Sequence, residues 1–342
     1  MKYMSLEILM AGIILVSLTF YVLLAGADYG AGVWALLARG SRAPRQRKLI
    51  DEAIGPIWEA NHVWLILVVT VMFTAFPAAF AAITTRLHIP LTLLLIGVVL
   101  RGAGFAFHKY GIRQGEMRPH WAGIFAVASV ITPVLLGTTI GAIASGALGG
   151  NERSFLAAFV WPWLAPFPLA VGLLTLVLFA FLAAVYLTRE ATDKQLQEDF
   201  RRRALLSSVM VGVLACAVFG LAAHAPQIRH ELFRSVWGWS LILVTTVFAS
   251  AAIFALWRRY FALARLCAAG EAVLILWGWA FAQFPFLVVP NITISNAAAS
   301  PFTLRLLLVA ILAGGAVLFP SLYYLFRVFK GRTLFGRQAG SP

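Results

Sequence analysis

Charged residues are scarce in this 342-residue chain: they make up 12% of it, whereas hydrophobic residues make up 61%. Such a composition is too apolar for a water-soluble domain of this size. Long polar linkers are also lacking, because only short connectors separate the apolar stretches. We therefore predict a single, all-α, polytopic membrane domain that covers residues 1–342.

Cysteine and several catalytic motifs are rare or missing. Cys216 and Cys267 lie in separate apolar stretches without a CxxC partner, which is typical of small core residues. No glycine-rich phosphate loop or Ser/His/Asp constellation is recognisable. Among six histidines, we assign only His62 and His224 to the membrane spans themselves, near opposite faces of the membrane. We expect this chain to hold no metal and no cofactor of its own at a catalytic centre.

Nine apolar stretches are present, each long enough to cross a hydrocarbon core of about 30 Å, which needs about 20 helical residues. They cover residues 5–38, 56–80, 87–108, 119–148, 159–188, 204–224, 235–257, 261–285 and 302–326. The first continues into the basic segment RGSRAPRQRK, so we expect a retained span rather than a cleaved signal peptide.

Acidic residues are few, with 13 Asp and Glu against 27 Lys and Arg, for a net charge of +14. The basic residues are strongly segregated: 20 lie at the connectors on the side of the C-terminus and 5 lie on the other side. This positive-inside pattern predicts an outer N-terminus and a cytoplasmic C-terminus. The charge is thus a topological signal, with some attraction to anionic membrane lipid, and we expect no nucleic-acid partner.

Ionisable residues inside spans usually face the bundle interior and mark a path or a site. At 1.5 Å per residue, Asp28 lies roughly 16 Å from the cytoplasmic boundary, Arg101 about 12 Å and Glu271 roughly 9 Å. Gly26 and Gly30 flank Asp28 and form a small-xxx-small face that allows close helix approach. Arg101 requires a carboxylate partner because arginine does not lose its charge.

The second span opens with IGPIWEANHVWLILVV, residues 54–69, where polar residues enter an apolar helix. Trp58 and Glu59 come first, and Asn61 and His62 follow one turn deeper. Glu59 and His62 share a helical face at i and i+3. Two interpretations stay open: a cytoplasmic proton or ion route, or a structural cap and polar seam that holds helices together.

Several motifs resemble one known family. LAGADYGAG, GPIWEANHVWLI, FTAFPAAFAA and IPLTLLLIGVVLRGAGFAF occur in order over residues 25–108, and FPFLVVPN occupies 284–291. Together with nine spans and short loops, they resemble subunit II of the cytochrome bd quinol oxidases. Glu59 stands where many members have Asp, which resembles the cyanide-insensitive-oxidase branch.

The resemblance implies a chain of two four-helix bundles plus one helix in the bacterial inner membrane. It implies a heterodimer with a haem-bearing subunit I, which holds haems b and d, or b alone, and oxidises quinol. Small single-helix subunits and a structural quinone or lipid are further partners that members of such a family can hold. This chain would stabilise the haem subunit and supply it with cytoplasmic protons, or with a passage for oxygen.

By position, the resemblance assigns the proton entrance to Trp58 and Glu59. Asp28, Arg101 and Glu271 would continue the route, with Asn61 and His62 beside its mouth. A proton-coupled secondary transporter is the alternative function, because it too would explain buried carboxylates. No clear internal repeat supports that alternative.

Overall fold

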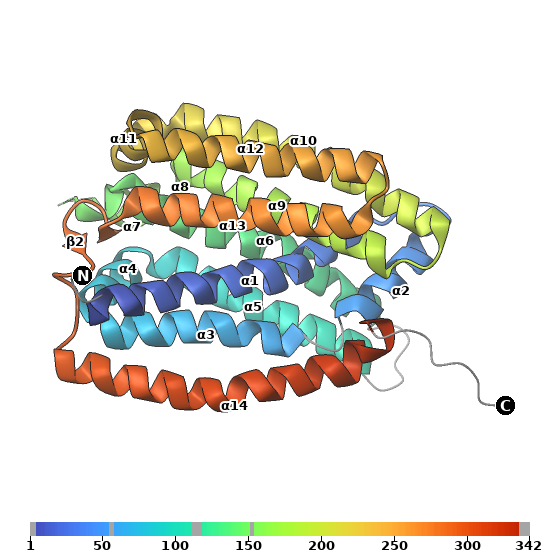
Figure 1. The fold of residues 1–342 in the computed structure, drawn as a ribbon, viewed down its shortest axis with the longest axis horizontal. Coiled ribbons are helices and arrows are strands. Elements are labelled where there is room, and N and C mark those ends of the chain that lie inside the picture. The colour runs from blue at the N-terminus through green and yellow to red at the C-terminus, as the bar shows by residue number, and fades with distance from the viewer. Residues whose placement is uncertain (1–4, 55–57, 111–117, 151–153, 335–342) are drawn as a thin grey trace.

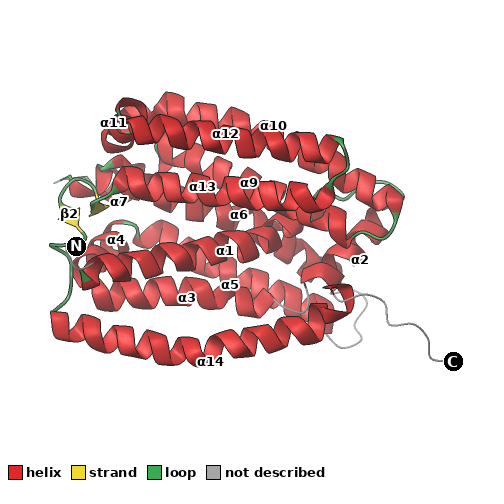
Figure 2. Cartoon of the chain, in the orientation of Figure 1, coloured by secondary structure: helices red, strands yellow, loops and turns green. Residues whose placement is uncertain are grey.

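The protein is represented by a computed structural model that describes residues 5–54, 58–110, 118–150 and 154–334. Within these ranges almost all of the chain is helical, and the loops between helices are short (Figure 2). Eight of the described helices are long and apolar enough to cross a membrane, or nine if one sharply bent pair counts as a span. The chain is therefore a polytopic, all-α membrane protein.

The first four long helices form one bundle: α1 (Leu6–Leu36), α3 (Trp58–Ala75), α5 (His88–Tyr110) and α6 (Arg118–Ser145). In it α1 packs on α3 and α6, and α5 packs on α6. The next four long helices form a second bundle: α9 (Pro166–Glu190), α10 (Lys194–Leu221), α12 (Val236–Trp257) and α13 (Phe261–Gln283). The central helix is α9, which contacts α1 and α6 in the first bundle and α10 and α13 in the second.

The last long helix, α14 (Pro301–Leu334), lies along α3 at the edge of the molecule (Figure 1). Only 6% of the residues in an apolar 18-residue segment of α14 are buried, compared with 61% of those in the corresponding segment of α9. Trp64 of α3 links it to the bundle, because the indole stacks on Phe20 at 4.4 Å and contacts Phe319 at 6.3 Å between ring centroids. The exposed apolar surface of α14 is suited to lipid or to another protein chain.

Shorter elements close the two ends of the bundles. At one end lies α2 (Ala43–Ile54). At the other end lie α4 (Pro77–Arg86), α7 (Phe155–Phe159), α8 (Trp161–Leu164), α11 (Pro226–Arg234) and an antiparallel pair of short strands, β1 (Phe286–Val288) and β2 (Ile292–Thr293). Two 3₁₀ turns, η1 (Ala147–Gly149) and η2 (Ala222–His224), follow α6 and α10 at this second end.

The second span differs from the continuous stretch expected over residues 56–80. Helix α3 ends at Ala75, and α4 leaves it at 116°. Phe76 is non-helical, with φ −133° and ψ 60°, and Pro77 starts α4. Proline has no N–H for the helical hydrogen bond, and it disfavours helical geometry in the preceding residue, so the helix breaks here.

The basic connectors lie together at the α2 end of the molecule. His108 at the end of α5 lies 3.4 Å from Asp51 of α2. Arg45 of α2 pairs with Asp193 in the α9–α10 connector at 3.0 Å. Arg259 in the α12–α13 connector pairs with Glu198 of α10 at 3.5 Å. The loops that the sequence assigns to one side of the membrane thus meet in space.

Helices α1 and α9 approach each other very closely. A Cβ atom added to Gly30 would lie 1.9 Å from the carbonyl oxygen of Phe179, and one added to Gly26 would lie 2.8 Å from the Phe179 ring. The sequence prediction of a small-residue face at Gly26 and Gly30 is confirmed, and its partner is α9.

Replacing Gly30 with alanine should therefore force α1 and α9 apart. We expect Gly30→Ala to destabilise the protein by about 1–3 kcal/mol, the usual effect of overpacking, and to lower the Tm of the purified protein. Gly12→Ala is the matched control on the same helix, because a Cβ atom there meets nothing within 4 Å. Equal Tm values for the two variants would contradict this packing.

Candidate functional site

The entrance predicted at the start of α3 is described only in part. The backbone of α3 begins at Trp58. The side chains of Trp58 and Glu59 lie outside the described residues, so their roles stay predictions. One turn deeper, Asn61 and His62 are described, and Asn61 is 1% exposed.

Asp28 and Asn61 meet inside the first bundle. The Asn61 Nδ2 amide donates a hydrogen bond to Asp28 Oδ2, which joins α3 to α1. Both side chains are buried. An amide donor stabilises a buried carboxylate without adding a charge, and in hydrocarbon such a polar pair also holds two helices together. The sequence singled out both residues but did not pair them.

Arg101 of α5 is fully buried against aromatic rings. Its guanidinium carbon lies 4.4 Å from the ring centre of Tyr29 on α1 and 5.3 Å from that of Phe125 on α6. Within the described part of the chain, its Nε and Nη2 atoms are buried and donate no hydrogen bond. The contacts that the structure defines for Arg101 are cation–π contacts, which a planar, weakly hydrated guanidinium makes well. The carboxylate partner expected from the sequence stays a prediction.

Two tyrosines complete this group, and sequence reasoning missed them. The Tyr21 and Tyr29 hydroxyl oxygens are 3.3 Å apart. The ring of His62 lies 6.3 Å from each tyrosine ring, measured between centroids. Tyr21 and Tyr29 are eight residues apart on α1 and therefore share a face, a spacing that could have revealed them.

We call Asp28, Asn61, His62, Arg101, Tyr21 and Tyr29 the bundle cluster. Its members come from α1, α3 and α5 and occupy the core of the first bundle. It combines a carboxylate, an imidazole, a fixed positive charge and two hydroxyl groups. These groups can accept, hold and pass protons, and the guanidinium favours negative charge nearby.

Glu271 lies apart from these contacts. It is 3% exposed and lies on α13, a helix of the second bundle. Helix α13 contacts α9, α12 and α1. Among the described residues no hydrogen bond connects its carboxylate to the bundle cluster. The nearest defined polar link between α13 and α1 is the bond from Trp277 Nε1 to Thr19 Oγ1, 2.9 Å. A continuous route from Asp28 to Glu271 therefore remains a prediction.

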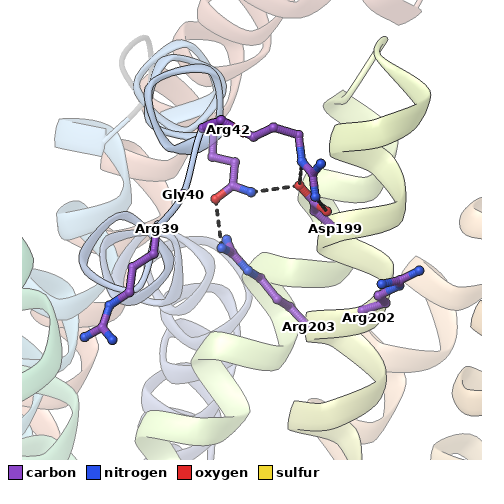
Figure 3. A pocket seen from close by; sticks show the side chains of 8 residues that line it. Arg39, Gly40, Arg42, Asp199, Arg202 and Arg203 are labelled. Carbon is purple, nitrogen blue, oxygen red and sulfur yellow. Dashed lines mark hydrogen bonds and ion pairs between the residues drawn. The ribbon is translucent and has the colours of Figure 1, made fainter.

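A second polar group, at the α2 end, was also missed from sequence (Figure 3). Arg42, which directly precedes α2, forms a two-pronged salt bridge with Asp199 of α10, at 2.8 and 2.9 Å. Gln46 donates to Asp199 and accepts from Arg203, each at 2.8 Å. Arg203 in turn lies over the Trp34 ring at 5.2 Å. These residues, the end clamp, tie α2 and α1 to α10 beside a cavity of about 380 Å³.

The described residues do not resemble a metal or haem site. They contain no group of three or more His, Cys, Asp or Glu side chains placed to hold a metal ion. In the bundle cluster, His62 packs beside the rings of Tyr21 and Tyr29. The positively charged Arg101 guanidinium lies over the Tyr29 ring.

The fold and the bundle cluster define a multi-pass membrane protein with a buried polar centre. The family model for cytochrome bd terminal oxidase subunit II matches residues 6–329, so the chain belongs to that family. Complexes of this family are quinol oxidases that contain haem and a partner subunit I.

Two relatives come from Bacillus subtilis. The chain is 22% identical to a putative cytochrome bd menaquinol oxidase subunit II, over 93% of this chain and 94% of the relative. It is 26% identical to a cytochrome bd ubiquinol oxidase subunit 2, over 93% and 95%. A solved bd oxidase structure from Geobacillus thermodenitrificans has a chain with a TM-score of 0.74 at 22% identity, covering 97% of this chain and 99% of that one. That similarity shows the fold.

The hydrogen bond between Asn61 and Asp28 gives a first test. Asn61→Leu removes the donor from a buried carboxylate, which should cost about 1–3 kcal/mol and lower the Tm of the complex. Thr70→Val on the same helix is the control, because the Thr70 hydroxyl bonds only within α3, to Ile66 O, and is exposed. An unchanged Tm for Asn61→Leu would show that the bond does not stabilise the bundle.

The end clamp gives a second test. Asp199→Ala removes the acceptor that binds Arg42 and Gln46 and should lower the Tm, with a smaller effect at high salt than at low salt. Glu52→Ala is the control, because Glu52 pairs with Lys48 at 3.9 Å and both side chains are exposed. A Tm loss as small as that of the control would mean that the clamp contributes little.

Proposed function

We propose that this chain is the subunit without haem of a bd-type quinol:oxygen oxidoreductase. In this proposal it forms a heterodimer with a haem-bearing subunit I, stabilises that subunit, and carries protons toward the oxygen-reduction site. Family membership supports the complex, and the single observation that supports the proton role is the Asn61–Asp28 bond inside the bundle cluster. Ionisable groups in a membrane interior are costly, so a connected group of them favours a functional path.

The membrane orientation follows from charge. The connectors at the α2 end carry most of the basic residues, so we place that end in the cytoplasm of a bacterium, at the inner membrane. Asp28 and Asn61 then stand in the cytoplasmic half of the first bundle. Glu59, two residues before Asn61, would receive protons at the entrance, and Trp58 would border it.

In this scheme Glu59 and Asp28 are the successive proton carriers. Protons enter near Glu59 and pass by water to the Asp28 carboxylate, which Asn61 holds in place. Arg101 keeps this region favourable for a carboxylate, and the Tyr21–Tyr29 hydroxyl pair extends the hydrogen-bonding surface along α1. Quinol would release its protons on the outer side and oxygen reduction would consume protons from the inner side, so charge is separated across the membrane.

The transporter alternative fits the structure less well. Transporters of that kind break their helices near the membrane midplane to build a binding site. The break between α3 and α4 lies at the end of the bundle, where Ala75 O accepts a bond from Ala299 N beside the strands. The family to which the chain belongs is also one of oxidase subunits.

Asp28→Asn is the test of the proton role. The amide keeps the shape of the side chain but cannot carry a proton, so we expect oxygen consumption with quinol to fall by about tenfold or more. The visible haem spectrum and the amount of assembled complex should stay as in the wild type. Glu59→Gln should show the same pattern.

The controls separate proton transfer from structure. Glu52→Gln removes a carboxylate at the same end of the molecule but outside the cluster, and should leave the rate unchanged. Loss of assembly in Asp28→Asn, with full activity per remaining complex, would support a purely structural cluster. A purified complex without haem absorption would contradict the oxidase assignment itself.

A further inference from the structure

The α11 end of the molecule contains a large amphipathic cavity. Its volume is about 820 Å³, which lies in the range of roughly 300–1,000 Å³ typical of small-molecule sites. It is lined by the last turn of α10, by η2 and by α11: Phe219, Gly220, Ala223, Pro226, Arg229, His230, Phe233 and Arg234. The lining of the cavity combines apolar and basic side chains.

The basic residues in the lining are unusual for this end of the molecule. Only five of the 27 Lys and Arg residues fall in the connectors at this end, and two of them, Arg229 and Arg234, line this one cavity. In the described part of the chain, neither guanidinium has a carboxylate partner, whereas His230 lies 3.4 Å from Glu231. By comparison, Arg86 at the same end is bound to Gly150 O at 2.6 Å. Two free guanidinium groups at one cavity favour a negatively charged ligand.

The apolar lining residues adjoin an exposed apolar face of α10. Phe219 and Phe233 form an edge-to-face pair, with ring centroids 5.6 Å apart, in the cavity wall. One face of α10 carries Leu206, Val213 and Gly220, which are spaced by seven residues. The side chains of Leu206 and Val213 are more than half exposed. An acyl chain that starts in the cavity can therefore run along α10.

Helix α11 has the character of an interfacial helix. Ile228 and Leu232 are buried on one face, while Arg229 and Arg234 are exposed. Exposed tryptophans, Trp237 and Trp239, follow at the start of α12, where a membrane interface favours aromatic residues. These features place the cavity at headgroup depth.

We propose that this cavity binds the phosphate headgroup of an anionic phospholipid, with Arg229 and Arg234 on the phosphate and the acyl chains along α10. The proposal rests on the placement of the chain in a membrane and is independent of the proton role. The lipid would brace α11 against α10 at the end of the second bundle.

Gly220 provides a test, because it lines the cavity and a Cβ atom added there meets nothing within 4 Å. The whole complex is purified, placed in nanodiscs of phosphatidylcholine with a small share of spin-labelled phosphatidylglycerol, and the immobilised label is measured. Gly220→Leu should abolish the immobilised component. Arg229→Gln and Arg234→Gln should each weaken binding by about fivefold, the effect of one basic residue near an anionic headgroup.

Matched controls exist for both kinds of change. Gly212→Leu lies on the same helix and also meets nothing within 4 Å, but it lies outside the cavity. Arg258→Gln removes a basic residue at the opposite end of the molecule. Both should bind the label as the wild type does.

Other outcomes would overturn the proposal. Equal immobilised label in wild type, Gly220→Leu and both arginine variants would mean that this cavity binds no phosphatidylglycerol. Displacement of the label by millimolar inorganic phosphate would mean a general anion site rather than a lipid site. Loss of a co-purified quinone in Gly220→Leu, with label binding unchanged, would assign the cavity to a different ligand.

Discussion

The close contact between α1 and α9 is the constraint on which the rest of the molecule depends. Gly30 touches the backbone of Phe179, and no residue with a side chain fits there without movement. The same contact stacks Tyr29 on the Phe179 ring, at 6.2 Å between centroids. It thereby joins the two bundles and fixes the part of α1 that carries Asp28 and Tyr29.

The bundle cluster is built on this fixed segment. Since polar groups are costly in a hydrocarbon interior, contacts with one another stabilise them. Asn61 bonds to Asp28, the two tyrosine hydroxyls lie side by side, and the Arg101 guanidinium packs on Tyr29. At the α2 end of the molecule, the end clamp holds α2 against α10.

Much of this arrangement is readable from the sequence, for physical reasons. Span lengths follow from the thickness of the membrane, and the small face of Gly26 and Gly30 follows from their spacing. The importance of Asp28, Asn61 and Arg101 follows from the cost of burying them. The aromatic contacts of Arg101 could not be predicted, because nothing local shows which helices become neighbours. The bond from Arg42 to Asp199 crosses more than 150 residues of sequence, and the turn at Phe76 depends on packing at the end of the bundle as well as on Pro77.

Proton uptake by the reconstituted complex tests the central claim most directly. The complex is placed in liposomes with the α2 end facing a compartment that contains a pH-sensitive dye, and a pulse of oxygen is given with excess quinol. The account predicts that wild-type protein takes up protons from that compartment during turnover, and that Asp28→Asn slows this uptake together with oxygen reduction. Proton uptake at the wild-type rate in Asp28→Asn would contradict it.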